Sequence, residues 1–218
     1  MSRTSLEAVF RPRSVAILGA SSDENKIGGR PLRYLKHYEF DGPIYPINPN
    51  RSEVQGLRAY KSILDVRGEV DLALIVLPAT AVLPAICECA EKGVKAVVIF
   101  SSGFAETGDE GRVTQREMRR IADDAGMRIV GPNCMGIAAF DHNMIITFGV
   151  SMMNLPPELG PVSIVSQSGA YGSVTYAEAR LRYLGVRLWA TTGNESDVNV
   201  ADCLSYYVED FETKVILM

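Results

Sequence analysis

Hydrophobic residues come in short runs, separated by longer stretches in which apolar positions recur at helical spacing. The short runs predict strands, and the longer stretches predict helices. In the first part of the chain the predicted strands cover 14–18, 43–47, 71–78, 96–100 and 128–133. The predicted helices cover 27–38, 81–92 and 110–125. Glycines, which are typical of helix ends, follow the last two of these helices.

The predicted strands are apolar almost throughout, as in 71–78, which reads Asp-Leu-Ala-Leu-Ile-Val-Leu-Pro. Such a run suits a parallel strand that is buried on both faces. The segment 57–62 is expected to be a short extended link. Because strands and helices alternate, we expect an α/β fold with a doubly wound parallel sheet, in which ligands bind at the carboxyl ends of the strands.

The alternation breaks between 138 and 159, a stretch that we expect to be irregular. We therefore expect a first domain over 1–140, a linker over 141–159 and a second α/β unit over 160–218. In the second unit the predicted strands cover 161–166, 186–190 and 214–217, and the predicted helices cover 170–183 and 200–208. Three strands are too few for a finished flavodoxin-like domain. We therefore expect a fragment of a longer polypeptide.

Composition and charge exclude several classes of function. The chain is 47% hydrophobic and has a formal net charge of −4 with interspersed charges, so it offers no broad basic surface to nucleic acid or to an anionic membrane. No apolar run approaches the length of a membrane span, and the first residues lack a secretory signal. We therefore expect a cytoplasmic protein. The four scattered cysteines indicate reduced thiols and no metal site.

The first predicted strand ends in the turn Gly19-Ala20-Ser21-Ser22, which leads past Lys26 into a helix. A strand-to-helix crossing directs backbone N–H groups and the positive end of a helix dipole toward one crevice, where phosphate oxygens are stabilised. The turn is not the dinucleotide fingerprint, because the next glycines are Gly28 and Gly29. We interpret it as a phosphate-binding turn.

The second predicted strand is followed by Asn48-Pro49-Asn50-Arg51. An NAD site would have an acidic residue here to hold the ribose hydroxyls. Arg51 instead suits a nucleotide with a phosphate on its ribose, which leaves NADP and coenzyme A as candidates. The alternative is a solvated arginine after a strand bounded by prolines.

All five predicted strands of the first domain end in turns of small or polar residues. At one edge of a sheet, these turns describe a crevice that is long enough for nucleotide phosphates and a pantetheine-like arm. The alternative is that α/β loops are generally rich in such residues. The turns are 19–22, 48–51, 78–80, 101–103 and 131–136.

A further turn, Ser166-Gln167-Ser168-Gly169-Ala170, follows a predicted strand and opens a predicted helix. Its spacing differs from the Gly-x-Ser-x-Gly elbow of hydrolases, and neither histidine can be assigned as a partner. We interpret it as an anion-binding turn in which Ser168 and Gly169 donate hydrogen bonds to a phosphoryl group.

With these motifs in family order over nearly the whole chain, the sequence resembles the NDP-forming acyl-CoA synthetases. This group includes the ADP-forming acetate–CoA ligases and is similar to the succinyl-CoA synthetase α subunit. The matching segments are Phe10–Ala16, Gly19–Ser21, Ile44–Pro49, Gly103–Glu106, Gly131–Cys134, Ser166–Ala170 and Gly193–Val198.

The resemblance implies a Rossmann-like CoA-binding domain followed, over 160–218, by the first half of a succinyl-CoA-ligase-like flavodoxin domain. It implies that Ser168 and Gly169 bind phosphate and that Arg51 stands where the α subunit has a lysine that contacts CoA. An arginine keeps the charge but changes its geometry. The implied CoA-binding residues are Gly19, Ala20, Ser21, Ser22, Lys26, Asn48, Pro49, Arg51, Pro78, Phe100, Ser101, Ser102, Gly103, Asn133 and Cys134.

In similar enzymes a histidine accepts phosphate from ATP and passes it to a carboxylate, and the thiol of CoA then attacks the acyl phosphate. The resemblance places that histidine in a later motif, outside this sequence. His37 and His142 are expected to be surface residues, so the catalytic residue of this chain is unknown. The resemblance further implies ATP and Mg²⁺, an ATP-grasp domain or subunit as partner, a small carboxylic acid as substrate, and an oligomer.

Two other functions stay open from the sequence. One is a CoA-binding regulatory module, like the similar region of bacterial protein lysine acetyltransferases. The other is an NADP-dependent reductase, which leaves Ser168 and Gly169 unexplained. The acyl substrate is not readable, because nothing in Phe104, Phe148 or Tyr171 separates acetate from a larger acid.

Overall fold

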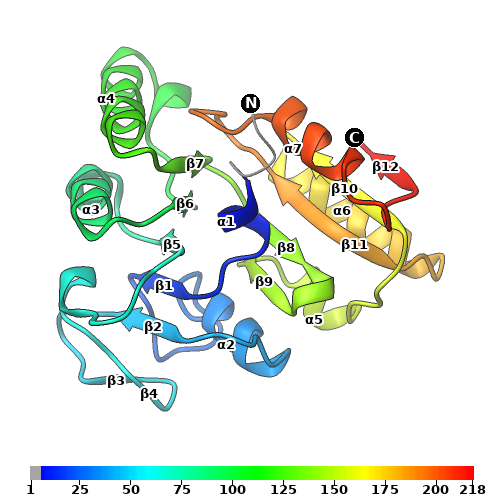
Figure 1. The fold of residues 1–218 in the computed structure, drawn as a ribbon, viewed down its shortest axis with the longest axis horizontal. Coiled ribbons are helices and arrows are strands. Elements are labelled where there is room, and N and C mark those ends of the chain that lie inside the picture. Colours follow the sequence, from blue (N-terminus) through cyan, green and yellow to red (C-terminus); the bar gives the residue numbers. More distant parts are fainter. Residues whose placement is uncertain (1–5) are drawn as a thin grey trace.

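The computed structural model describes residues 6–218 and contains two five-stranded sheets that lie side by side (Figure 1). In the first sheet, all neighbouring strands are parallel. Their order is β2 (Ile44–Ile47), β1 (Val15–Leu18), β5 (Leu72–Ile75), β6 (Ala96–Ile99) and β7 (Arg128–Val130). Every residue of β1, β5 and β6 is buried, as expected for strands covered on both faces.

Helices cover both faces of the first sheet, which confirms the doubly wound architecture. The short helix α1 (Glu7–Phe10) and α2 (Arg30–His37) pack on one face, and α3 (Ala79–Lys92) and α4 (Asp109–Ala125) pack on the other. Both α3 and α4 end at the glycines that the sequence indicates, Gly93 and Gly126, which adopt left-handed conformations.

Several predicted elements differ in length or kind. The segment around 57–62 contributes to a hairpin of β3 (Glu53–Val54) and β4 (Leu57–Arg58), whose turn has positive φ at Gln55 and Gly56. The predicted strand over 128–133 ends at Val130, because Gly131 and Asn133 also have positive φ. Short 3₁₀ turns lie at Ile63–Asp65, Ala105–Thr107 and Phe140–His142.

The second sheet is mixed. Its order is β12 (Val215–Leu217), β10 (Val162–Ser166), β11 (Val186–Thr191), β8 (Gly136–Ala139) and β9 (Met144–Thr147). The first three strands are parallel, and β8 and β9 are antiparallel. The helices of this part are α5 (Ser151–Asn154), α6 (Gly169–Leu181) and α7 (Val200–Val208).

The expectation of an irregular linker over 141–159 is wrong for β9, which is fully buried, and for the short helix α5. The run Met-Ile-Ile-Thr gains its partner only through a turn at Asn143, which has φ 53° and lets β9 fold back on β8. The division into two domains stays a prediction, with the change from one sheet to the other at 131–135.

One hydrophobic core is continuous between the two sheets. It joins residues of β1, β5 and β6 to residues of β8, β9 and β11, and α1 lies between the sheets (Figure 1). Phe10 of α1 stacks on Tyr206 of α7 at 4.9 Å between ring centroids. The turns of the first domain and those of the second unit therefore belong to one packed body.

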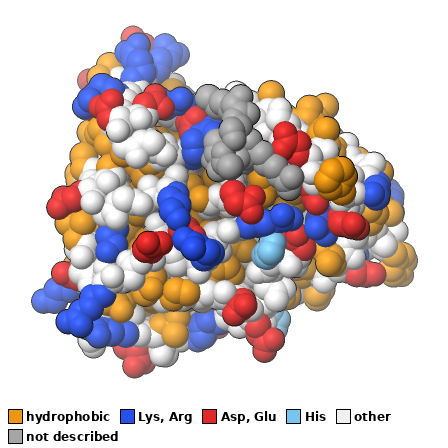
Figure 2. All heavy atoms as spheres, viewed as in Figure 1, with side chains coloured by type: hydrophobic (Ala, Val, Ile, Leu, Met, Phe, Trp, Pro, Cys, Tyr) orange, Lys and Arg blue, Asp and Glu red, His pale blue; other side chains and the backbone are white. Residues whose placement is uncertain are grey.

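The surface in Figure 2 has acidic and basic side chains side by side over most of the visible face. This mixture agrees with the charges interspersed along the chain. Within residues 6–218, no helix is long and apolar enough to cross a membrane.

Candidate functional site

The predicted phosphate-binding turn lies where the first sheet changes direction. The chain leaves β1 to form β2 on one side and later returns to form β5 on the other side of β1. In open α/β sheets this switch point opens a crevice at the carboxyl ends of the strands. The turn after β1 borders that crevice.

Two glycines allow the turn to fold tightly. Gly19 has φ 87°, and a Cβ atom there would lie 2.1 Å from the carbonyl oxygen of Val76. A Cβ atom at Gly28 would lie 2.3 Å from the carbonyl oxygen of Gly19. Ser21 N–H donates to the carbonyl oxygen of Gly28 at 3.1 Å, which closes the loop. The helix itself begins at Arg30, later than the sequence indicates.

Two amide side chains hold this loop from outside. Asn48 Nδ2 donates to the carbonyl oxygen of Ala20 at 2.9 Å. Gln55 Nε2 donates to the carbonyl oxygens of Ser21 and Gly29, both at 2.9 Å. Gln55 is absent from the sequence-predicted site. The turn-forming pair Gln55-Gly56 signals the hairpin, but nothing local signals its contact with residues 34 positions earlier.

The other predicted CoA-binding residues of the first domain lie on neighbouring turns of this edge. Arg51 is exposed and has no ion-pair partner among residues 6–218, and Ser22, Lys26 and Ser102 are also exposed. Ser101 Oγ donates to the carbonyl oxygen of Leu77 at 2.5 Å, so it ties two adjacent turns together. Pro49, Pro78 and Gly103 stand on the same series of turns.

One cavity of about 330 Å³ is lined both by residues from the end of the predicted CoA site and by residues of the predicted phosphate site. Asn133 and Cys134 come from the turn after β7, whereas Ser168 and Gly169 come from the start of α6. These residues are far apart in the sequence and line one space. The lining consists of Phe100, Asn133, Cys134, Met135, Phe148, Gln167, Ser168, Gly169, Ala170 and Gly193.

Cys134 is a neutral wall residue. Its side chain is buried, and its Sγ lies 3.4 Å from the carbonyl oxygen of Ile99. Burial raises the pKa of the Cys134 thiol to about 12. A thiol needs its thiolate form to act as a nucleophile. Cys134 is therefore expected to line the cavity as a neutral thiol.

Ser168 is the N-cap of α6, because its Oγ accepts a hydrogen bond from Tyr171 N–H at 3.3 Å. Its hydroxyl hydrogen remains available as a donor. The first N–H groups of an α-helix have no partners within the helix, and those of Gly169 and Ala170 belong to this class. Together these donors can stabilise an anion at the helix start.

The segment 193–198 ties the second unit to the first sheet. Val198 forms a parallel bridge with Val130 of β7. The buried carboxylate of Asp197 accepts hydrogen bonds from Arg128 Nε at 2.6 Å, from Arg119 at 2.7 Å and from Ile129 N–H at 2.9 Å. This motif therefore fixes the turn at Gly193 against the turn at Asn133.

Glu106 completes this junction. Burial alone would raise the pKa of Glu106, but hydrogen bonds from Gly103 N–H and from Asn194 lower it. Asn133 Nδ2 in turn donates a hydrogen bond to Asn194 Oδ1 at 3.3 Å. The carboxylate is therefore an ionised anchor between the two units, a role that the sequence does not reveal.

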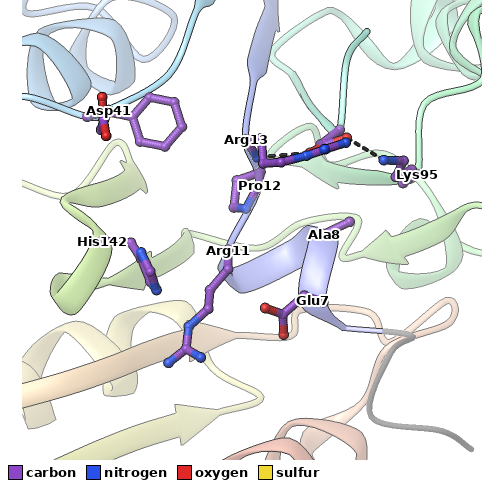
Figure 3. A pocket seen from close by; sticks show the side chains of 10 residues that line it. Glu7, Ala8, Arg11, Pro12, Arg13, Asp41, Lys95 and His142 are labelled. Atoms are coloured by element: carbon purple, nitrogen blue, oxygen red, sulfur yellow. Dashed lines mark hydrogen bonds and ion pairs between the residues drawn. The ribbon is translucent and has the colours of Figure 1, made fainter.

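A larger cavity of about 530 Å³ lies at the opposite, amino end of the first sheet (Figure 3). Asp71 lies between Arg13 Nε at 3.1 Å and Lys95 Nζ at 2.7 Å. Burial alone would raise the pKa of Asp71, but these hydrogen bonds lower it to about 2. His142 lines this cavity, and Figure 3 shows it on the side away from Arg13 and Lys95.

Both histidines lie outside the 330 Å³ cavity. His37 is exposed on α2 and contacts the ring of Tyr38 edge-on. His142 is exposed at the amino-end cavity. Neither contacts Ser168 or Gly169 among the hydrogen bonds of the described residues.

Comparisons with known proteins agree with this geometry. The family described as "CoA binding domain" matches residues 13–139, and the family described as "Succinyl-CoA ligase like flavodoxin domain" matches residues 159–218. The α subunit of the ADP-forming acetate–CoA ligase II of Pyrococcus furiosus is 41% identical over 213 residues. That alignment covers 98% of this chain and 45% of the relative.

Two further relatives widen the picture. A trans-feruloyl-CoA synthase from an unknown prokaryotic organism is 38% identical and is covered over 31% of its length, against 100% of this chain. A dinucleotide forming acetyl-coenzyme A synthetase of Ca. Korarchaeum cryptofilum, solved with phosphate and ADP, is 38% identical with a TM-score of 0.89. The match covers 97% of this chain and 44% of that one.

The chain thus spans between about a third and a half of the relatives named here. Their names do not support the regulatory-module alternative. With a CoA-binding domain over more than half of its length and ligase relatives over nearly all of it, this chain belongs to the NDP-forming acyl-CoA synthetase family.

Proposed function

We propose that this chain is the CoA-binding part of an ADP-forming acyl-CoA synthetase. The observation that carries the proposal is the 330 Å³ cavity, which joins the turn at Asn133 and Cys134 to the helix start at Ser168 and Gly169. An acyl phosphate must meet a thiol in such a reaction. The cavity offers a space for both groups in one place.

The residues of this chain have separate roles in that proposal. The turns after β1, β2, β5 and β6 hold the nucleotide and pantetheine parts of CoA, with Arg51 as a contact for a phosphate. The start of α6 stabilises the phosphoryl anion through Ser168 and through the N–H groups of its first turn. The step balances: the CoA sulfur bonds to the acyl carbon as the bond from that carbon to the phosphate oxygen breaks, and the thiol proton leaves with the released phosphate.

In this proposal the histidine that carries the phosphoryl group belongs to a later motif outside this sequence, and ATP and Mg²⁺ are bound by an ATP-grasp domain or subunit. The solved structure of the Ca. Korarchaeum cryptofilum relative is a complex with phosphate and ADP, which supports a nucleotide-binding partner. A small carboxylic acid as substrate, an oligomeric assembly and a cytoplasmic location remain part of the proposal.

The proposal is tested by calorimetric titration of the chain with CoA, NADP and NAD. We expect CoA to bind most tightly, because the turns suit a phosphorylated ribose and a long arm. A preference for either dinucleotide contradicts the proposal. With the ATP-grasp part present, formation of acyl-CoA and ADP from ATP, CoA and a carboxylic acid tests the complete reaction.

A further inference from the structure

Three aromatic residues that the sequence leaves equivalent have different positions in the structure. Phe104 is buried in the core of the first sheet and is 1% exposed. Tyr171 lies on α6 and is 60% exposed to solvent. Phe148 lines the 330 Å³ cavity and packs edge-on against Phe100, with 5.0 Å between the ring centroids. Among these three, only Phe148 can contact a group in the cavity.

Met135 lies on the same wall and is held firmly by its backbone. Its N–H donates to Thr191 Oγ1 at 2.9 Å, and its carbonyl oxygen accepts from Thr147 Oγ1 at 2.8 Å. These bonds anchor it to β11 and β9. The side chain of Met135 therefore projects from a fixed point in the mixed sheet.

Two glycines make room for that side chain. A Cβ atom at Gly169 would lie 2.5 Å from Met135 Cγ, and a Cβ atom at Gly149 would lie 3.1 Å from Met135 Cε. Ser173 Oγ lies 3.6 Å from the thioether sulfur. Met135 thus crosses the cavity wall directly beside the helix start that holds the phosphoryl group in the proposed function.

The chemistry limits where an acyl group can point. Its carbonyl carbon must lie between the thiol at Asn133 and Cys134 and the anion at Ser168 and Gly169. The substituent on that carbon then faces one of the remaining walls. Most of these walls consist of polar side chains or backbone atoms, whereas the side chains of Phe100, Met135 and Phe148 form an apolar wall. An apolar substituent is most stable against the apolar wall.

We propose that Met135, with Phe148 beside it, limits the length of the acyl group that this site accepts. The inference rests on the proposed function. The backbone of Met135 is held by two hydrogen bonds, and its side chain packs against two glycines. The backbone therefore cannot shift to make room for a longer acyl chain. A longer acyl chain meets its side chain.

The test is calorimetric titration of the 218-residue chain with CoA, acetyl-CoA and hexanoyl-CoA. The unsubstituted chain is expected to bind acetyl-CoA more tightly than hexanoyl-CoA. Met135→Ala removes the obstructing atoms and is expected to shift the ratio of the two dissociation constants by about tenfold in favour of hexanoyl-CoA. CoA itself lacks the acyl group that would meet Met135, so its dissociation constant is expected to change much less than that of hexanoyl-CoA.

Two variants serve as controls. Met135→Leu keeps most of the volume and is expected to leave the ratio unchanged. Met153→Ala removes the same side chain from α5, outside this cavity, and is also expected to leave the ratio unchanged. If circular dichroism shows Met135→Ala to be unfolded, Met135→Val takes its place, with a smaller shift expected in the same direction.

An unchanged ratio in a folded Met135→Ala or Met135→Val protein overturns the inference, as does an equal shift in Met153→Ala. If the unsubstituted chain binds CoA but does not distinguish the two thioesters, the inference fails and the proposed function stands. If it binds none of the three ligands, the proposed function fails and the inference falls with it.

Discussion

The two ends of the first sheet carry cavities of different size and different chemistry. The amino-end cavity is larger, about 530 Å³ against about 330 Å³, yet its central carboxylate at Asp71 already pairs with Arg13 and Lys95. The carboxyl-end cavity is smaller, but it contains a helix start whose donors are available to a ligand. Among the described residues, the amino-end cavity also has a donor without a partner, the buried Nε of Arg11. The two ends therefore differ in the kind of donor, since those of the carboxyl end are backbone N–H groups at a helix start.

This comparison predicts that changes at the carboxyl end alter ligand binding, whereas changes at the amino end alter stability alone. The largest effect is expected for Gly19→Ala. Gly19 has a positive φ, and the Cβ atom of an alanine there would lie 2.1 Å from the carbonyl oxygen of Val76. Together these two effects are expected to lower the unfolding free energy by about 3 kcal/mol. Equilibrium urea denaturation measures this loss, and CoA affinity is expected to fall as well.

Gly56→Ala is the matched control for Gly19→Ala. Gly56 has a similar φ of 82°, but a Cβ atom there meets nothing within 4 Å. Only the backbone cost of about 1 kcal/mol is expected. Equal losses in the two variants would show that the close approach to Val76 contributes nothing.

The next largest effect is expected at the amino end. In the folded chain the pKa of Asp71 is about 2, whereas an unfolded aspartate has a pKa of about 3.9. The stabilisation is therefore complete above about pH 4 and is lost as the pH falls through about 2. Asp71→Asn is expected to cost about 2–3 kcal/mol of unfolding free energy at neutral pH. The difference from the unsubstituted chain should shrink in acid.

Urea denaturation at pH 7, 4 and 2.5 checks the Asp71 prediction. Glu69→Gln is its control, because Glu69 contacts the same Arg13 at 3.3 Å but its side chain is 83% exposed. A loss below about 0.5 kcal/mol is expected there. A change in CoA affinity in Asp71→Asn would break the comparison by linking the amino end to ligand binding.

The smallest effect is expected for Arg51→Glu. Reversal of this exposed charge is expected to weaken CoA binding by about 1–3 kcal/mol and to leave the unfolding free energy unchanged. Calorimetry with CoA measures the first quantity. Arg67→Glu makes the same charge change at another exposed position and is expected to leave CoA binding intact. If CoA affinity falls equally in both variants, Arg51 acts only through its long-range charge and not through a contact with CoA.

Much of the fold could be predicted because its signals are local. A parallel strand buried on both faces is apolar throughout, as β5 is, and helices end where Gly93 and Gly126 supply left-handed backbone. β9 could not be predicted in the same way. Its pairing with β8 depends on the turn at Asn143 and on a sheet whose other strands come later in the chain.

The candidate site could be proposed from the sequence as separate turns, but not as a cavity. Small residues mark the turns at Gly19 and Ser168, since each follows a strand and opens a helix. No local pattern shows that Gln55 holds the first turn or that Met135 passes between two distant glycines. Such contacts are decided by tertiary packing, which a periodic pattern does not encode.

The attachment of Asp197 to Arg128 and Arg119 has a mechanical consequence. The two walls of the 330 Å³ cavity come from different sheets. The ion pairs of Asp197 and the Val130–Val198 bridge connect those two sheets next to the cavity. Separation of the two walls would leave the buried carboxylate of Asp197 without its ion pairs to Arg128 and Arg119. We therefore expect the distance between the two walls to change little when a ligand enters the cavity.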